Sequence, residues 1–406
     1  MRLKAIKENF TLFFIAFFSF SGYNAGLAII IGLGLNTTIV YSIPLRIFSS
    51  LLMIHYIFKH YNNLKSRNIS SRKTNILITL KIFAVLYIIK IILSFGIFGP
   101  LMPYSLKWFE YVLYFLNFCV LPFFMFSSID FNDNNKKVIL DALILSGFMM
   151  ALVCIFEYKA TIFSGHMGRL GMNRDEGNTL TPLALSYSAS LTIMLCIFQI
   201  LYKKGMTFKY KIYTVINILL SIILFLLGSS KGSILAIILC IPLFFVYSKV
   251  ATKLKLILIF SICVPLLVYG VAVSGSLLFD RLQFTEDNGD ITRGVLWDAA
   301  KREFWQHPII GGRIEVSSIY PHEIFLEILM ATGVVGVLLF LYVLIGAFKR
   351  SAYMCKRDYS NIFIFIILIQ GLAQSLVSGA LYVSILIFLP MGLIFASYKK
   401  NNLNLN

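Results

Sequence analysis

The sequence predicts an all-α, polytopic membrane protein built as one integral domain over residues 1–406, with about twelve transmembrane helices. Two observations support this fold class. The chain is 59% hydrophobic and 13% charged, with a mean hydropathy of +0.84, and a soluble protein of this size could not hide so much apolar surface. The apolar residues also gather in runs, and no polar segment between them is long enough to fold separately.

The apolar runs approach the ~20 residues that a helix needs to cross a bilayer. The first run is too long for one straight helix and contains SGYNAG at 21–26, so it is either kinked or divided into two short segments. The runs lie at residues 10–40, 43–59, 76–96, 108–128, 138–157, 181–202, 212–227, 233–249, 256–275, 323–347, 361–378 and 381–397.

The distribution of charge predicts the orientation of these spans. Loops rich in Lys and Arg alternate with loops that hold most of the Asp and Glu, and the positive-inside rule makes the basic loops and both termini cytoplasmic. Three polar elements then lie on the outer side: 158–180, the tip at 228–232 and the main loop at 276–322. Topology thus accounts for the formal charge of +18, which in a soluble protein would suggest nucleic acid, so we expect no nucleic-acid partner.

The main outer loop contains RLQFTEDNGDITRGVLWDAAKREFWQHPIIGG. From Thr292 to Gln306 its apolar residues recur at three- and four-residue spacing, which predicts an amphipathic helix lying along the membrane surface. We expect Thr292 or Asp290 to cap this helix and Pro308 to end it. Arg293 is then in the first turn, either as a solvated side chain or as a cation for an anionic substrate.

The other two outer elements also carry cations. Residues 158–180 hold Arg169 and Arg174 among four glycines, which is typical either of a solvated, flexible loop or of a cationic patch that an anionic substrate approaches closely. Lys231 lies between two apolar runs with almost no loop around it. It either snorkels to the headgroups or has a functional role near the hydrocarbon.

His322 stands at the start of a predicted span in the stretch IYPHEIFLEILMATGVVGVLLF. Its unperturbed pKa lies near neutrality, so it can accept a proton from a hydroxyl. Glu323 and Glu327 share one helix face, and both suit the positive end of the helix dipole as caps.

The residue types exclude several kinds of site. The chain has no P-loop, HExxH, GxSxG or CxxC pattern and no carboxylate cage for Mg²⁺, so we expect no metal and no cofactor. Fixed cations and a histidine on one side of a membrane fit a lipid phosphate or pyrophosphate. The cations would neutralise a leaving pyrophosphate while the histidine deprotonates the attacking hydroxyl.

The second half of the chain resembles the bacterial O-antigen polymerase and O-antigen ligase superfamily. In the ligase signature a His and a small polar residue are followed, after nine residues, by Gly, two residues and Gly, and His322, Glu323, Gly333 and Gly336 have this spacing. The stretch TRGVLWDAAKREFWQHPIIGG is similar to the family's Arg-led amphipathic helix with its Pro and glycines. GRLGMNRDEGNTLTPLALSYSASLTIML resembles a segment with an Arg-Gly stretch, an Asn and then a span, so the similarity covers about residues 160–340.

The resemblance implies a GT-C-like membrane glycosyltransferase in the bacterial inner membrane, with its active site facing the periplasm. Its donor would be a glycan on undecaprenyl pyrophosphate, and the transfer would be metal-independent and inverting. Membrane lipid and a chain-length regulator protein are further candidate partners.

The resemblance also implies residue roles. His322 would activate the acceptor hydroxyl and Arg293 would bind the pyrophosphate. Lys231 stands where the family often has Arg, and it keeps the charge without the bidentate phosphate geometry. Glu323 replaces the usual Asn, Ser or Gln and would raise the pKa of His322 by pairing with it. The residues expected to bind substrate are Arg169, Arg174, Lys231 and Glu323.

Three activities stay open at this point. We favour an O-antigen polymerase, which joins lipid-linked repeat units, because the departures at Lys231 and Glu323 suit the more divergent polymerases. The alternative is an O-antigen ligase, which transfers the glycan to the lipid A core with the same donor chemistry. A lipid-linked oligosaccharide flippase is less favoured, because its polar groups should lie near the bilayer midplane, where Lys90 is the main candidate.

Overall fold

The described part of the protein is helical. The computed structural model describes residues 7–35, 39–61, 71–99, 106–165, 167–171, 180–203, 205–274, 278, 288–316 and 320–398. Within these ranges the regular elements are helices, which confirms the all-α prediction. Arg174 and His166, both in the outer loop at 158–180, lie outside the described residues.

The helices confirm a polytopic membrane protein. Among the residues that the structure describes, nine helices are long and apolar enough to cross a membrane. A tenth candidate is the pair α2 (Phe10–Phe18) and α3 (Ser21–Gly32), bent by 65°, so the first apolar run is indeed broken. Two shorter apolar helices, α13 (Lys231–Val246) and α19 (Ile385–Ala396), fall below that length, and the total of about twelve crossings stays a prediction.

The chain divides into two compact units. Unit 1 comprises residues 1–52, 132–285 and 354–373, and unit 2 comprises 53–131, 286–353 and 374–406. Apart from α2, α3 and α13, unit 1 contains part of α4 (Ile39–Lys59), α9 (Asp133–Glu157), α10 (Lys159–Phe163), α11 (Pro182–Tyr202), α12 (Phe208–Gly228), α14 (Val250–Ser274), the 3-10 turn η3 (Tyr359–Asn361) and most of α18 (Ile362–Val377).

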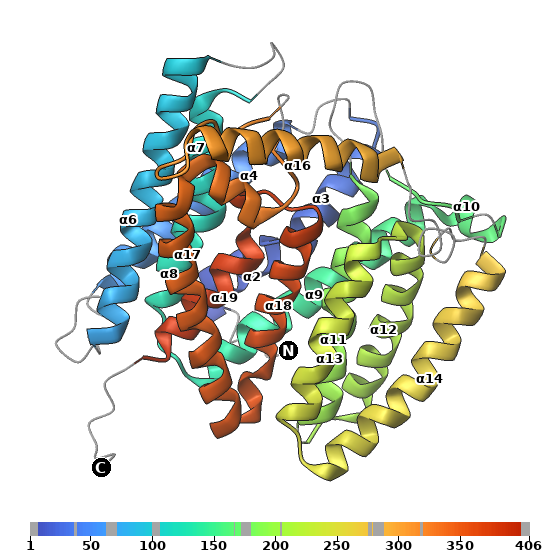
Figure 1. Ribbon diagram of the computed structural model, residues 1–406. Helices are drawn as coiled ribbons and strands as arrows, with labels where there is room; N and C mark the ends of the chain where they lie inside the picture. Colours follow the sequence, from blue (N-terminus) through green and yellow to red (C-terminus); the bar gives the residue numbers. More distant parts are fainter. Residues whose placement is uncertain are drawn as a thin grey trace. The chain divides into compact units, whose positions relative to one another are not determined.

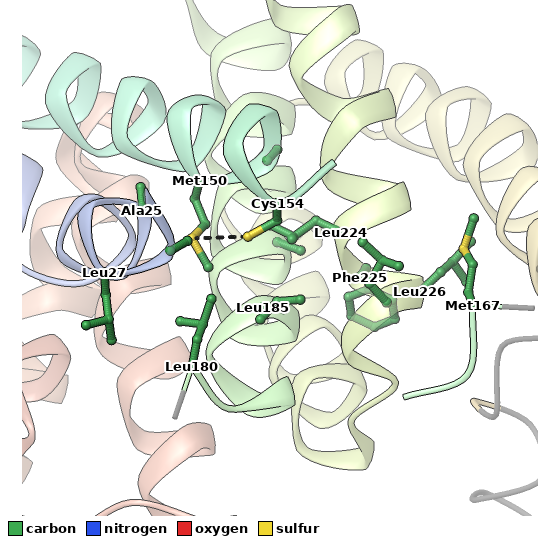
Figure 2. Close-up of a cluster of buried hydrophobic side chains, with 14 of the residues drawn as sticks. Ala25, Leu27, Met150, Cys154, Met167, Leu180, Leu185, Leu224, Phe225 and Leu226 are labelled. Carbon is green, nitrogen blue, oxygen red and sulfur yellow. Dashed lines mark hydrogen bonds between the residues drawn. The ribbon is translucent and has the colours of Figure 1, made fainter. Parts of the chain in front are cut away.

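Unit 1 is organised around α11. This helix is buried on all sides from Leu185 to Gln199 and packs against α9, α12 and α13, as expected of a helix that is apolar all round. Figure 1 shows α11 to α14 running alongside one another in green and yellow. In Figure 2, Met150 and Cys154 of α9 meet Leu185 of α11 and Phe225 of α12 in the core.

Local capping chemistry fixes the starts of these helices. Asn132 caps α9, because its side chain accepts a hydrogen bond from the N–H of Asn135 at 2.8 Å. Thr181 caps α11 by accepting from Ala184, and Pro182 at the first helical position has no N–H to satisfy.

Unit 2 contains the histidine and the arginine that the sequence singles out. It includes α19 and parts of α4 and α18. Its other elements are α6 (Ser71–Leu93), the π-helix η1 (Ser94–Phe98), α7 (Trp108–Phe115), the π-helix η2 (Leu116–Val120), α8 (Leu121–Ser127), α16 (Asn288–Gln306), α17 (Ile324–Arg357) up to residue 353, and the 3-10 turn η4 (Leu381–Val383). The core pairs α19 with α8, and Phe340 of α17 lies between Phe83 of α6 and Phe388 of α19.

The predicted helix of the main outer loop exists, with a different start. It begins at Asn288 instead of Thr292, so the prediction that Thr292 or Asp290 caps it is wrong, and Arg293 lies in the second turn. The end at Gln306, before Pro308, is confirmed. Helix α16 runs crosswise to α17 (Figure 1), and Leu296 and Ala300 bury one of its faces against Val316 and the start of α17.

Helix α17 is broken at Gly333, one of the signature glycines. Gly333 has φ 64° and ψ −163°, which interrupts the helical hydrogen bonds. The loop after α16 replaces them: Val334 N–H donates to the Pro308 carbonyl at 3.0 Å, and Val335 N–H donates to Ile309 at 3.2 Å. Backbone buried at membrane depth is tolerated when protein groups satisfy it in this way.

Three other elements of unit 2 hold the same loop in place. Lys90 of α6 donates to the Gly311 carbonyl at 2.6 Å, so the charge suspected of an intramembrane role binds backbone. Glu303 of α16 accepts from Arg313 N–H at 2.9 Å, and Tyr111 of α7 donates to Glu315.

Candidate active site

His322 adopts an uncommon backbone conformation. Its φ of 60° lies in the left-handed region, which costs a non-glycine residue about 1–3 kcal/mol and is found most often at functional sites. The surrounding bonds hold the turn. Trp297 of α16 donates its indole N–H to the Pro321 carbonyl at 2.9 Å, and Glu323 caps the helix that follows. A rigid turn therefore presents His322 at the start of α17.

The imidazole lies in an aromatic environment. Its ring centroid is 4.3 Å from that of Tyr320, which in turn makes an edge contact with Tyr382 at 5.9 Å. Nδ1 of His322 is buried and has no hydrogen-bond partner among the described residues. Burial raises the pKa of Tyr320 to about 12, so this phenol stays neutral beside the imidazole.

Burial also lowers the pKa of His322 below its usual 6.5, and the positive charge of Arg293 lowers it further. A hydrogen-bonding interaction with the backbone of Ser378 opposes both effects. The imidazole is therefore neutral at neutral pH, and a neutral imidazole with an unpartnered, buried nitrogen is a competent proton acceptor.

The structure places Arg293 within electrostatic reach of His322. Arg293 projects from the second turn of α16 and is half-buried, and its charge acts on both His322 and Tyr320. A neutral base next to a fixed cation can take a proton from a hydroxyl while it stabilises negative charge that develops nearby.

Glu323 is a helix cap. One carboxylate oxygen accepts from Phe325 N–H at 3.1 Å and the other from Leu326 N–H at 2.6 Å. Burial raises the pKa of Glu323, and these two backbone bonds oppose the rise. Glu323 is not a cause of the His322 shift, which is downward, so the expectation that pairing with Glu323 raises the pKa of His322 is wrong.

Glu327 lies in the first turn of α17, as the pattern predicts, but it does not cap the helix. Its side chain is fully buried, accepts Leu381 N–H at 2.8 Å and accepts the Tyr87 hydroxyl at 3.2 Å. Sequence reasoning missed this role, and it missed Tyr320 and Tyr382. A signal was present for Glu327, because a carboxylate inside an apolar span costs about 2.5–3.5 kcal/mol at depth unless it is paired.

The remaining described cations of the predicted site lie in unit 1. Leu170 N–H donates to the Leu227 carbonyl at 2.9 Å, so the segment that carries Arg169 is held at the end of α12. Lys231 begins α13 at the same tip, after Ser229 with φ 42°. The structure thus brings together the segments of Arg169 and Lys231, which favours a cationic patch over a free loop.

Comparison with protein families identifies the segment that carries His322 and Arg293. Residues 216–341 match the family model described as O-antigen ligase. This segment includes Lys231, Arg293 and His322 with the glycines that follow it, and it leaves out Arg169. No curated protein and no solved structure matches the chain.

Proposed function

We propose that this chain, whose residues 216–341 confirm its likeness to the O-antigen polymerase and ligase superfamily, is an O-antigen polymerase. It joins oligosaccharide repeat units linked to undecaprenyl pyrophosphate, on the periplasmic face of the inner membrane, by metal-independent glycosyl transfer. The observation that carries the proposal lies within the matched segment. It is the neutral imidazole of His322, with its Nδ1 unpartnered among the described residues, within electrostatic reach of the guanidinium of Arg293.

The chemistry follows from these two groups. His322 takes the proton of the acceptor sugar hydroxyl as the hydroxyl oxygen attacks C1 of the donor sugar. The bond between C1 and the pyrophosphate oxygen breaks, and its electron pair leaves with undecaprenyl pyrophosphate. Arg293 binds the negative charge that develops on this leaving group. His322 then releases its proton to water, so the base is restored for the next transfer.

The other expected residues receive proposed roles according to their surroundings. Arg169 and Lys231, at the end of α12, are proposed contacts for phosphate or glycan. Arg174, which follows Arg169 in the same outer loop, keeps its expected role as a substrate contact. Glu323 caps the start of α17 and so holds the turn that presents His322 to the substrate.

An O-antigen ligase is the second candidate, and the description of the matching family favours it. Polymerase and ligase share the donor, the base and the leaving group, so they differ only in the acceptor. The departures at Lys231 and Glu323 are the reason to prefer the polymerase. A flippase is less favoured, because Lys90 binds the backbone of a loop in its own unit instead of lining a transport site.

The test is the lipopolysaccharide profile of a clean deletion strain on gels, with complementation by wild type or by a His322 variant. Core carrying a single repeat unit in the deletion strain supports the polymerase. Bare core, with long polymer left on the lipid carrier, supports the ligase and overturns the polymerase. An unchanged ladder contradicts both.

Asparagine is the substitution of choice at position 322. It tolerates the left-handed backbone conformation, whereas alanine at a φ of 60° adds strain. His322→Asn therefore removes the base with little disturbance of the turn, and it should fail to complement although the protein accumulates normally.

A further inference from the structure

The connector between α18 and α19 lies against the imidazole of His322. We define this connector as Ser378–Ser384, in which the chain leaves the α-helix and forms the short turn η4. The backbone of Ser378 interacts with the imidazole. Further along the connector, Tyr382 packs edge-on against Tyr320, whose ring makes a tilted contact with the imidazole of His322 at 4.3 Å. The position of the connector thus sets the surroundings of the base.

Glu327 ties this connector to the rest of unit 2. Its Oε2 accepts the N–H of Leu381, in the middle of the connector, at 2.8 Å. Its Oε1 accepts the hydroxyl of Tyr87 on α6 at 3.2 Å, which holds the carboxylate from the other side. The Leu381 carbonyl in turn accepts a hydrogen bond from the thiol of Cys119 at 3.0 Å. The connector is therefore anchored through buried polar groups on three elements.

The two ring nitrogens of His322 have different surroundings. Nδ1 is buried without a hydrogen-bond partner among the described residues, so the nitrogen that interacts with the Ser378 backbone is Nε2. A backbone carbonyl accepts and does not donate, hence Nε2 carries the proton. The bond made by one nitrogen sets the tautomer of a neutral imidazole, which leaves the lone pair of Nδ1 available.

We propose that Glu327 is the positioning residue for His322: it anchors the connector, the Ser378 carbonyl fixes the Nε2–H tautomer, and Nδ1 is the atom that accepts the proton. In many nucleophile–base pairs a carboxylate orients the base directly. Here the Ser378 carbonyl orients the imidazole, and the carboxylate of Glu327 orients the connector that carries this carbonyl. This positioning role rests on the proposed function in one respect, which is that the proton comes from a sugar hydroxyl.

The groups around the imidazole limit what a titration can report. The charge of Arg293 on α16 acts on it, Glu323 is its neighbour in the chain, and the ring of Tyr320 lies between the imidazole and Tyr382 of the connector. Of these described groups, Arg293 is the one whose charge shifts the pKa of His322. Glu327 thus acts on the imidazole through the connector, so a variant there changes the titration only if the connector moves.

The test measures the titration of His322 directly, in the full-length protein in detergent. Diethyl pyrocarbonate modifies neutral imidazole, and mass spectrometry of the His322 peptide across pH gives the midpoint independently of any glycan. In Glu327→Ala the connector loosens and water reaches the ring, so the midpoint rises toward 6.5. The kcat of transfer should fall about 10- to 100-fold, because small misplacements of a base are costly, while KM is unchanged.

Two further variants separate anchoring from other roles. Glu327→Gln can still accept from Leu381 and bond to Tyr87, so its midpoint and kcat should match wild type. Glu303→Ala is the matched control, because it removes another mostly buried carboxylate of unit 2 that accepts a backbone N–H, without a bond to the connector. It should lower stability and leave the midpoint of His322 where it is.

Nuclear magnetic resonance of ¹⁵N-labelled histidine measures the tautomer of His322 directly. The chain has five histidines, so ¹⁵N-histidine spectra of wild type and His322→Asn identify the His322 signals by difference. At a pH above the midpoint we expect the proton on Nε2, and a spectrum with the proton on Nδ1 overturns the proposal.

The outcomes are distinguishable. An unchanged midpoint and kcat in Glu327→Ala overturn the positioning role, and so does a Glu327→Gln protein as inactive as the alanine variant, because then the charge matters instead of the anchoring bonds. If Glu327→Ala does not fold, Tyr87→Phe removes one anchoring bond alone, and its midpoint should shift in the same direction by less. A shifted midpoint in a protein that transfers no glycan leaves the positioning role standing and contradicts the proposed function.

Discussion

Replacing Gly333 with alanine tests how the loop after α16 docks on the broken helix α17. A Cβ atom on Gly333 would lie 2.4 Å from the carbonyl oxygen of Ile309 and 2.6 Å from the nitrogen of Gly311, closer than real Cβ contacts occur. The backbone at φ 64° and ψ −163° is also in a region that glycine alone adopts readily. Backbone strain of about 1–3 kcal/mol and overpacking of similar size add to about 2–6 kcal/mol of lost stability.

Thermal unfolding of the purified protein in detergent measures this loss. Gly346→Ala is the matched control in the same helix, because its Cβ would meet the end of the Ile76 side chain at 3.1 Å and Cζ of Phe395 at 3.9 Å, so its nearest contacts are side-chain atoms. Alanine also favours a helix by about 1 kcal/mol over glycine. We expect a clear fall of Tm in Gly333→Ala and little change in Gly346→Ala. Equal Tm values for wild type and both variants would refute the docking of this loop on α17.

Three further predictions concern the charged groups. Transfer needs neutral His322, whose pKa lies below 6.5, so activity should persist as pH falls to 6.5 and decline only below it; a midpoint above 6.5 in the pH–rate profile contradicts this. Arg293→Gln removes a charge that lowers the pKa of His322, so the midpoint of diethyl pyrocarbonate modification should move to higher pH. An unchanged midpoint would show that the charge of Arg293 does not act on His322. Lys231→Arg restores bidentate phosphate geometry, so the KM for the lipid-linked donor should fall in a transfer assay, whereas a rise would remove Lys231 from the donor site.

Much of the fold follows from periodicity and composition. The apolar runs predict the helices because each must satisfy its own backbone in lipid, and the three- and four-residue spacing predicts most of α16. The start of α16 was placed four residues late, at Thr292 instead of Asn288, because the added turn carries too few apolar residues to show the spacing. The break of α17 at Gly333 was also missed, since the partners that satisfy it come from a distant loop.

The candidate site, like the fold, could be predicted from the sequence only in part. His322 and Arg293 were identified from their residue types and from the family resemblance, and the structure places them within electrostatic reach. The surroundings of the base depend on contacts between residues far apart in the chain: Tyr87 and Glu327 are 240 residues apart, and Glu327 and Leu381 are 54 apart. No local pattern records such pairs. The sequence did show that Glu327 and Lys90 are charges within apolar runs, but the partners that stabilise them had to come from the fold.

The most direct test of the account is transfer by the purified protein in vitro. Wild type and His322→Asn, checked for equal Tm, would be given a repeat unit on undecaprenyl pyrophosphate, and both the lengthened glycan and the released undecaprenyl pyrophosphate would be measured. The account predicts both products from wild type and neither above background from His322→Asn. Equal rates from the two proteins would contradict the assignment of His322 as the base.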